Sequence, residues 1–192
     1  MKFRTSFTAT YRWSSTDRNG LEHLWIEANG NAVKVRSVLA GNRGGIPYGI
    51  SYKIICDSKW RVRNFKVLSV DGRLLHLMSD GEGNWSDTTG KQLARFQGAI
   101  DIDLAGTPFT NTLPVRRLAK HEPQARQQFK MLYVPFDTLA PRLDDQAYTC
   151  IQPFELYRYE AIDRAFEADL PVDENGIVFD YPTLFTRKPL AG

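Results

Sequence analysis

The sequence predicts an all-β protein in which about fourteen strands form a single antiparallel rolled sheet, a spiral β-roll or half-barrel, with one or two short helices. Short runs rich in Val, Ile, Tyr, Phe and Thr are separated by Gly, Asn, Asp and Pro at intervals of roughly ten residues. Helix signals are sparse. An antiparallel sheet of this many strands curls or closes, so we expect it to enclose an apolar interior.

In the first half of the chain, strands are expected over Ser6–Trp13, Glu22–Glu27, Ala32–Leu39, Pro47–Cys56, Arg61–Ser69 and Leu74–Met78. Asp71 and Gly72 separate the last two runs and predict a two-residue primed hairpin turn, because glycine tolerates positive φ. Asp57 and Ser58 predict a second hairpin by the same turn chemistry.

In the second half, strands are expected over Gln92–Phe96, Ile100–Leu104, Phe129–Val134, Ala147–Gln152, Glu155–Ala161, Phe166–Leu170 and Ile177–Tyr181. One short helix is predicted, with Thr112 as its N-cap, Pro114 in its first turn and Val115–Lys120 as its body. No linker or low-complexity run interrupts the pattern, which indicates one domain over residues 1–192.

Composition places the chain among folded globular proteins: 42% of its 192 residues are hydrophobic and 24% are charged. Its longest apolar stretches run about eight residues, against roughly 20 for a membrane-spanning helix, so no transmembrane segment is expected. The amino terminus lacks the apolar core and the small-residue cleavage site of a secretory signal peptide. We therefore expect a cytoplasmic location.

The charge balance argues against nucleic acid as a partner, because 25 basic and 22 acidic side chains leave a surplus of only +3. The charges are unevenly distributed. The segment Phe154–Asp180 contains eight acidic and two basic side chains, a net charge of −6, so the rest of the chain carries +9. These acids either pair with basic side chains of a neighbouring element, such as Arg126 or Lys130, or form a field that steers a ligand.

No cofactor and no metal are expected. Cys56 and Cys150 lie far apart and predict two buried thiols rather than a disulfide, and His23, His76 and His121 have no metal-ligand spacing. The chain also lacks the glycine-rich phosphate-binding motifs and the nucleophile motifs of hydrolases.

The segment from Asp101 to Arg117 has the highest density of polar functional groups in the chain. In a strand, Asp101 and Asp103 point to the same face, which makes a carboxylate pair. Such a pair has three interpretations: structural pairing with Arg116 or Arg117, ligand binding, or general acid and base catalysis on a glycosidic or ester bond.

Pro108 and Pro114 stiffen the loop that carries Thr110, Asn111 and Thr112, so these side chains form either a recognition rim or a set of backbone hydrogen bonds at a helix entry.

Aromatic residues offer a second group of candidates. Tyr157 and Tyr159 share one strand face, and with Tyr181 they either line a cavity or pack in the core. Trp85 follows a glycine-containing turn, where its indole either stacks on a sugar ring or covers the core.

Taken together, these motifs resemble a known bacterial family, named "putative glycolipid-binding" and formerly a domain of unknown function. The matching motifs are Gly81–Trp85, Asp101–Leu104, Thr107–Arg117, Gln146–Thr149, Tyr157–Glu160 and Val178–Pro182, with Arg187 beyond them. The resemblance covers nearly the whole chain. It implies a rolled or spiral sheet similar in shape to the lipoprotein carriers of bacterial envelopes, whose curved sheet holds acyl chains. Unlike those carriers, this sequence has no expected signal peptide.

The leading hypothesis is non-catalytic binding of an amphipathic ligand, a lipid or glycolipid, with acyl chains against the apolar interior of the curved sheet. The candidate ligand-binding residues are Trp85, Asp101, Asp103, Asn111, Arg116, Arg117, Tyr157, Tyr159 and Tyr181. Two alternatives remain: a hydrolase that uses Asp101 or Asp103, and a structural or partner-binding protein with a filled interior.

Overall fold

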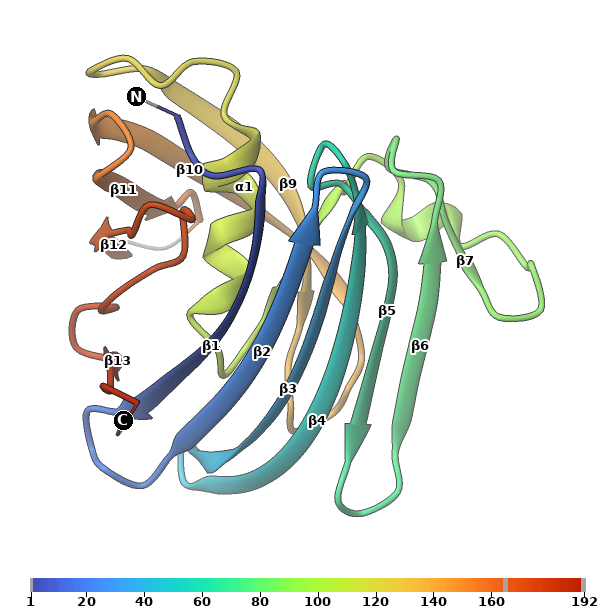
Figure 1. The fold of residues 1–192 in the computed structure, drawn as a ribbon. Helices are drawn as coiled ribbons and strands as arrows, with labels where there is room; N and C mark the ends of the chain where they lie inside the picture. Colours follow the sequence, from blue (N-terminus) through green and yellow to red (C-terminus); the bar gives the residue numbers. More distant parts are fainter. Residues whose placement is uncertain (1, 164–165, 191–192) are drawn as a thin grey trace.

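The computed structural model describes residues 2–163 and 166–190 and shows an all-β protein rolled around one short helix (Figure 1). The larger of its two sheets is antiparallel and has the strand order β13-β1-β2-β3-β4-β5-β6-β7. Its strands are β1 (Ser6–Ser15), β2 (Leu21–Asn29), β3 (Ala32–Arg43), β4 (Ile46–Asp57), β5 (Val62–Ser69), β6 (Leu74–Ser79), β7 (Trp85–Asp87) and β13 (Phe185–Arg187). Seven of these strands follow one another along the chain, as a series of hairpins requires.

The smaller sheet is strongly curved and has the order β12-β11-β10-β9-β8. It contains β8 (Asp101–Leu104), β9 (Arg126–Val134), β10 (Arg142–Gln152), β11 (Leu156–Ala161) and β12 (Phe166–Pro171). Strands β8 and β9 are parallel, because a helical crossover connects them, and the other pairs are antiparallel. The predicted all-β rolled architecture is confirmed, with the roll divided into two sheets.

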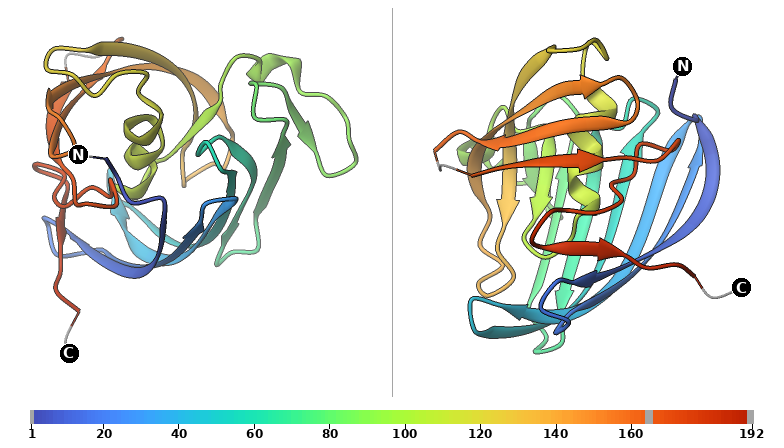
Figure 2. Two further views of the ribbon diagram at one scale, coloured as in Figure 1. Left: turned by 45° about the horizontal axis from the view of Figure 1, so that its top comes forward. Right: turned by 90° about the vertical axis from the view of Figure 1, so that its left-hand side faces the viewer.

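The crossover helix α1 (Thr112–Arg117) lies inside the roll, where both views in Figure 2 show it enclosed by strands. A 3-10 turn over Phe109–Asn111 leads into it. Thr112 is already helical, with φ −62° and ψ −34°, so it is not the cap, and the extended Leu118 ends the helix earlier than the sequence predicts. A six-residue helix is unstable alone in water, so its burial in the roll maintains it.

Two predicted strands are wrong. Gln92–Phe96 contains a single bridge residue followed by the 3-10 turn Ala94–Phe96, and Ile177–Tyr181 contains only isolated bridges. The hairpin at Asp71 and Gly72 is present but wider than expected. Gly72 donates its backbone N–H to the Ser69 carbonyl and adopts a φ of 88°, so the loop spans residues 70–73 rather than two residues.

The core has two parts. Side chains from the inner face of the large sheet, such as Ile54 and Phe65, pack against Ile102 of β8 and Leu132 of β9. A second cluster fills the curve of the small sheet. It includes Val115, Tyr148, Tyr157, Leu170 and Cys150.

Both cysteines are buried free thiols, as predicted. No helix within the described ranges is long and apolar enough to cross a bilayer.

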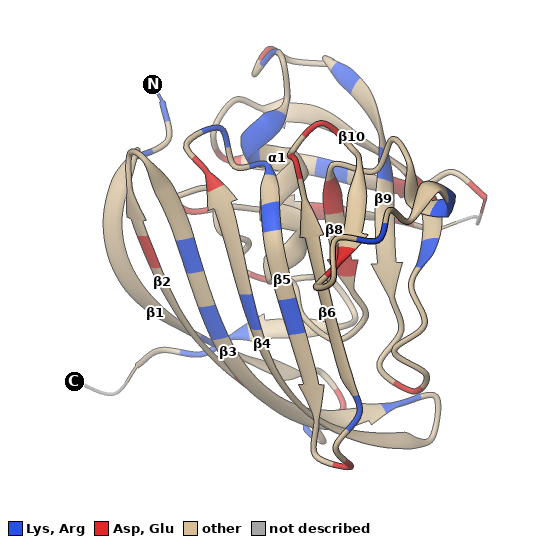
Figure 3. Cartoon of the chain, turned by 90° about the vertical axis from the view of Figure 1, so that its right-hand side faces the viewer, with Lys and Arg blue, Asp and Glu red and all other residues tan. Residues whose placement is uncertain are grey.

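Acidic side chains of the C-terminal segment make the expected ion pairs in part. Arg126 of β9 contacts Glu160 at 2.9 Å, and Arg158 contacts Asp169 at 2.7 Å. Most of the charged residues on the outer face of β3, β4 and β5 are basic (Figure 3).

Arg187 of β13 joins the edge of the large sheet to the segment that follows the small sheet. Its Nη1 lies 2.7 Å from a carboxylate oxygen of Asp173, and its Nη2 donates to the carbonyl oxygens of Ile177 and Val178 at 2.8 and 2.6 Å. The guanidinium also lies over the Phe179 ring, 4.2 Å from its centroid. Because Arg187 uses the carbonyls of 177 and 178, this apolar run does not form the predicted strand.

We expect Arg187→Ala to lower the free energy of unfolding by about 3–5 kcal/mol, since it leaves the buried Asp173 carboxylate without its cation. Arg187→Lys restores only part of the loss, because an ammonium cannot replace the planar guanidinium fork. Urea denaturation measures both. Arg158→Ala, which breaks a solvent-accessible pair with Asp169, serves as the control and should cost far less. An equal effect of the two alanine variants would contradict this role.

Candidate functional site

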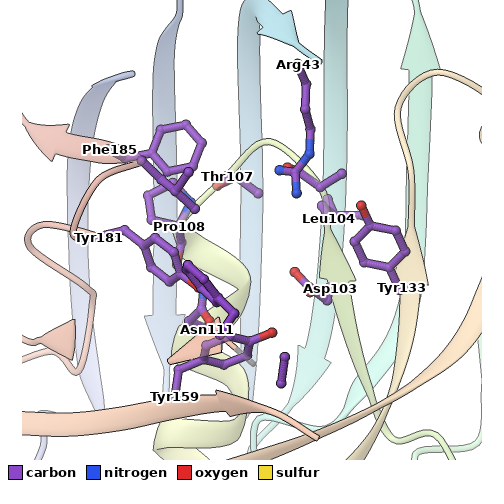
Figure 4. Close-up of a pocket in the computed structure, with 14 residues that line it drawn as sticks. Arg43, Asp103, Leu104, Thr107, Pro108, Asn111, Tyr133, Tyr159, Tyr181 and Phe185 are labelled. Atoms are coloured by element: carbon purple, nitrogen blue, oxygen red, sulfur yellow. The ribbon is translucent and has the colours of Figure 1, made fainter. Parts of the chain in front are cut away.

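A cavity of about 350 Å³ opens between the small sheet, the loop that enters α1 and the chain segment leading into β13 (Figure 4). It is lined by Arg43, Asp103, Leu104, Ala105, Thr107, Pro108, Asn111, Tyr133, Tyr159, Ala161, Phe166, Tyr181, Leu184 and Phe185. Four of the nine candidate residues from the sequence lie here: Asp103, Asn111, Tyr159 and Tyr181.

Asp103 is the carboxylate of this cavity, and Figure 4 shows it among the lining side chains. Its Oδ2 accepts a hydrogen bond from Gln146 Nε2 at 2.8 Å, and its Oδ1 accepts one from Thr110 Oγ1 at 3.2 Å. Burial raises the pKa of Asp103, and the Gln146 hydrogen bond partly opposes this shift. Two neutral donors therefore fix the carboxyl group in place, and its remaining lone pairs can accept hydrogen bonds from a ligand.

Aromatic rings form one wall of the cavity. The Tyr159 ring lies 6.2 Å from that of Tyr181 and 6.1 Å from that of Phe166, and Phe166 and Tyr181 stack with an interplanar angle of 24°. Tyr181 is positioned by a β-bridge to Phe185, another residue of the wall. This wall combines apolar ring faces with phenol groups, which suits a ligand that has both C–H and O–H surfaces.

Arg43, at the end of β3, reaches the cavity from the large sheet. It donates to the backbone carbonyl of Ala105, and its positive charge lowers the pKa of Asp103 slightly against the effect of burial. Since Arg43 and Ala105 are 62 residues apart in the chain, no local pattern could have revealed this contact.

Asn111 contributes to the cavity wall, but the protein already uses its side chain. Its Oδ1 accepts a hydrogen bond from the buried Tyr148 hydroxyl at 2.8 Å, and its Nδ2 donates to the Pro108 carbonyl at 3.3 Å. These bonds rigidify the loop between Pro108 and the helix.

Asp101 has a different environment from Asp103. It is 1% exposed, forms an ion pair with Arg117 and does not line the cavity. Burial raises its pKa, and Arg117 opposes the shift. The two carboxylates stand side by side on one strand face and do not oppose each other across an open cleft, as glycoside hydrolysis requires. The arrangement therefore gives no support to an acid and base pair made of Asp101 and Asp103.

The other candidates lie away from this cavity. Arg116 donates to the carbonyl oxygens of Arg4 and Asn175, and its guanidinium lies 4.2 Å from the centroid of the Trp60 ring. Burial lowers the pKa of Arg116 to about 10. Arg116 lines a separate hollow at another part of the roll.

Tyr157 and Trp85 belong to the core. The Tyr157 hydroxyl is 2.8 Å from His121 Nδ1 and accepts a hydrogen bond from the Phe154 backbone N–H. The Trp85 indole N–H donates to the Ala99 carbonyl at 2.7 Å, and the side chain is 1% exposed. Its indole therefore presents no face on which a sugar ring could stack.

Among the described residues, no cluster of three or more His, Cys, Asp or Glu side chains is arranged to hold a metal ion. The cavity offers one fixed carboxylate acceptor, one guanidinium donor and an aromatic wall.

A second buried carboxyl group, Glu22 of β2, lies behind the cavity residue Thr107. Its Oε1 accepts hydrogen bonds from Ser37 Oγ at 2.7 Å and from the Tyr52 hydroxyl at 2.6 Å, and Tyr52 is 3.4 Å from Thr107 Oγ1. Burial raises the pKa of Glu22 to about 7 although these hydroxyl groups oppose the shift. Glu22 therefore takes up a proton near neutral pH.

Since its folded-state pKa of about 7 exceeds the ordinary value of 4.5, Glu22 stabilises the fold fully below pH 4.5, and the contribution is lost as pH rises through 7. We expect the free energy of unfolding to fall by about 3 kcal/mol between pH 5 and pH 8. Urea denaturation at each pH measures this change. Glu22→Gln should remove most of this fall. Glu27→Gln, at a partly exposed position on the same strand, should leave it unchanged, and a Glu22→Gln profile as steep as that of the parent protein would contradict the assignment.

Comparisons with known proteins agree with this architecture. No curated protein sequence matches the chain significantly. A crystal structure of a DUF1089 family protein from Pseudomonas aeruginosa is similar to it with a TM-score of 0.75 and 37% sequence identity, over 87% of this chain and 92% of that one. The sequence profile of a family described as "Putative glycolipid-binding" matches residues 10–187. The match spans nearly the whole roll, and the chain belongs to this family.

Proposed function

We propose that this protein binds a glycolipid non-covalently and holds its sugar headgroup in the cavity beside Asp103. The observation that carries the proposal is the fixed Asp103 carboxylate facing an aromatic wall. A sugar offers hydroxyl donors to a carboxylate and C–H faces to aromatic rings, so both parts of the cavity have a complementary surface on such a ligand. The family description supports the same ligand class.

The charge of the cavity favours a neutral headgroup over an anionic one. Asp103 has neutral hydrogen-bond partners, Gln146 and Thr110, so its own charge repels a phosphate or carboxylate. Arg43 supplies the guanidinium of the cavity, and it already donates to Ala105. Hydroxyl groups, which donate to Asp103 and accept from Arg43, satisfy both side chains at once.

The size of the cavity also bears on how the lipid binds. At about 350 Å³ it lies at the lower end of the range for small-molecule sites, roughly 300–1,000 Å³. The helix α1 and the two core clusters occupy the interior of the roll. The cavity therefore suits a headgroup and the first carbons of a chain, whereas long acyl chains stay outside the roll. The proposal differs in this respect from the expectation that the curved sheet encloses acyl chains.

Native mass spectrometry after incubation with a mixed bacterial lipid extract tests the proposal. We expect a discrete adduct whose mass, after denaturing lipid analysis, identifies a sugar-bearing lipid. Adducts of fatty acids or phospholipids without sugar, or no adduct after saturating incubation, would overturn it.

Asp103→Asn should weaken binding of that adduct by about tenfold to a hundredfold, since it removes a charged hydrogen-bond acceptor worth roughly 1.5–3 kcal/mol. Titration calorimetry with the identified lipid, or with octyl glucoside as a soluble probe, measures the change. Asp145→Asn alters an exposed aspartate of β10 outside the cavity and serves as the matched control. An unchanged affinity in Asp103→Asn would place the headgroup elsewhere.

A further inference from the structure

The outer face of the large sheet carries a row of cations. Arg36 of β3 stands opposite Lys53 of β4, Lys53 opposite Lys66 of β5, and Lys66 opposite His76 of β6. Figure 3 shows this face with Lys and Arg positions coloured blue on several adjacent strands. Like charges that face each other across neighbouring strands destabilise a sheet. Repulsion within the row therefore costs some stability in the isolated protein, and an anionic partner would reduce this cost.

The basic side chains of this row form no ion pair with another described residue. Within the described part of the chain, no ion pair involves Arg36, Lys53, Lys66 or the nearby Lys34. The acidic side chain that strand β2 places on this face, Glu27, is opposite Lys34. Part of the positive surplus that the sequence assigns to the chain outside residues 154–180 therefore lies on this one surface.

Exposed aliphatic side chains flank the cations on both sides. Val38, Leu68 and Leu74 form the neighbouring row and are 58%, 41% and 54% exposed. On the other side, Ile55 and Met78 are also exposed. A shallow hollow of about 400 Å³ lies beside the row of basic side chains. It is lined in part by Trp25, Lys53, Lys66 and Leu68. We name the surface made by these basic and aliphatic residues of β2–β6 the basic face.

We propose that the basic face docks on the surface of an anionic lipid bilayer. Lys and Arg side chains attract anionic headgroups, and aliphatic side chains beside them enter the boundary between headgroups and acyl chains. A nucleic-acid surface offers phosphates but no apolar layer for Val38, Leu68 and Leu74. A bilayer complements both kinds of side chain. The inference does not depend on the headgroup cavity, whose residues lie elsewhere in the roll.

Vesicle co-sedimentation tests the docking. The protein should sediment with vesicles of phosphatidylcholine mixed with phosphatidylglycerol, should bind pure phosphatidylcholine at least tenfold more weakly, and should dissociate as salt is added. Lys53→Glu/Lys66→Glu should lower the affinity for the anionic vesicles at least tenfold. This variant is expected to fold, since it replaces one like-charged pair at positions 53 and 66 with another and places an opposite charge beside Arg36. Near-ultraviolet circular dichroism checks its folding.

Lys91→Glu/Lys120→Glu is the matched control. It makes the same change in net charge at two exposed lysines outside the basic face and should retain vesicle binding. Asp103→Asn should also retain it, which separates this proposal from the headgroup site. The docking would be overturned if the two double variants lost vesicle affinity equally or if the protein showed no preference for anionic vesicles. Binding to a DNA duplex without binding to vesicles would also overturn it. A dimer that Lys53→Glu/Lys66→Glu abolishes, without vesicle binding by the parent protein, would overturn it too.

Discussion

Strand β8 fixes the helix that fills the roll, and the rest of the architecture depends on this attachment. Asp103 accepts a hydrogen bond from Thr110 just before α1, and Asp101 pairs with Arg117 at the last residue of the helix. The two carboxylates of one strand face thus hold both ends of a helical segment that is too short to persist alone. Once the helix is held there, it fills much of the space between the sheets.

The same strand shows how environment divides two chemically equal side chains. Asp101 is buried and forms an ion pair with Arg117, so its charge is already balanced within the protein. Asp103, two residues on, has neutral partners and borders a cavity. A buried charge without a counter-ion is costly, and hydrogen bonds from a ligand reduce that cost. The asymmetry is a physical reason for a polar, uncharged ligand group to settle at Asp103.

The sequence predicted those features that depend on local geometry. The period of two in a strand placed Asp101 and Asp103 on one face, and the pattern of apolar residues located most of the strands. It left open which arginine pairs with the carboxylates. Arg116 and Arg117 are adjacent, but successive helical residues point in directions about 100° apart, so only Arg117 reaches Asp101.

Features that arise from distant contacts could not be predicted in this way. Arg43 enters the cavity through a hydrogen bond to Ala105, far along the chain. The three-residue strand β13 exists because it pairs with β1 at the sheet edge, and it is too short to give a pattern. Ile177–Tyr181 looks like a strand, yet Arg187 takes two of its carbonyl groups. In each case a contact outside the local sequence pattern determines the structure.

The two faces of the large sheet have separate physical tasks. An antiparallel sheet can bury one face and expose the other to water, and here the buried face packs against β8 and β9. If the outer face served only solubility, alternating charges would suit it better than an uninterrupted row of cations beside exposed aliphatic residues. Strand β3 contributes to both proposed sites, with Arg36 on the basic face and Arg43 in the cavity. If the basic face holds the protein on a bilayer and the cavity binds the headgroup of a lipid, the acyl chains of that lipid stay in the membrane. That arrangement explains why a lipid-binding roll can have a filled interior.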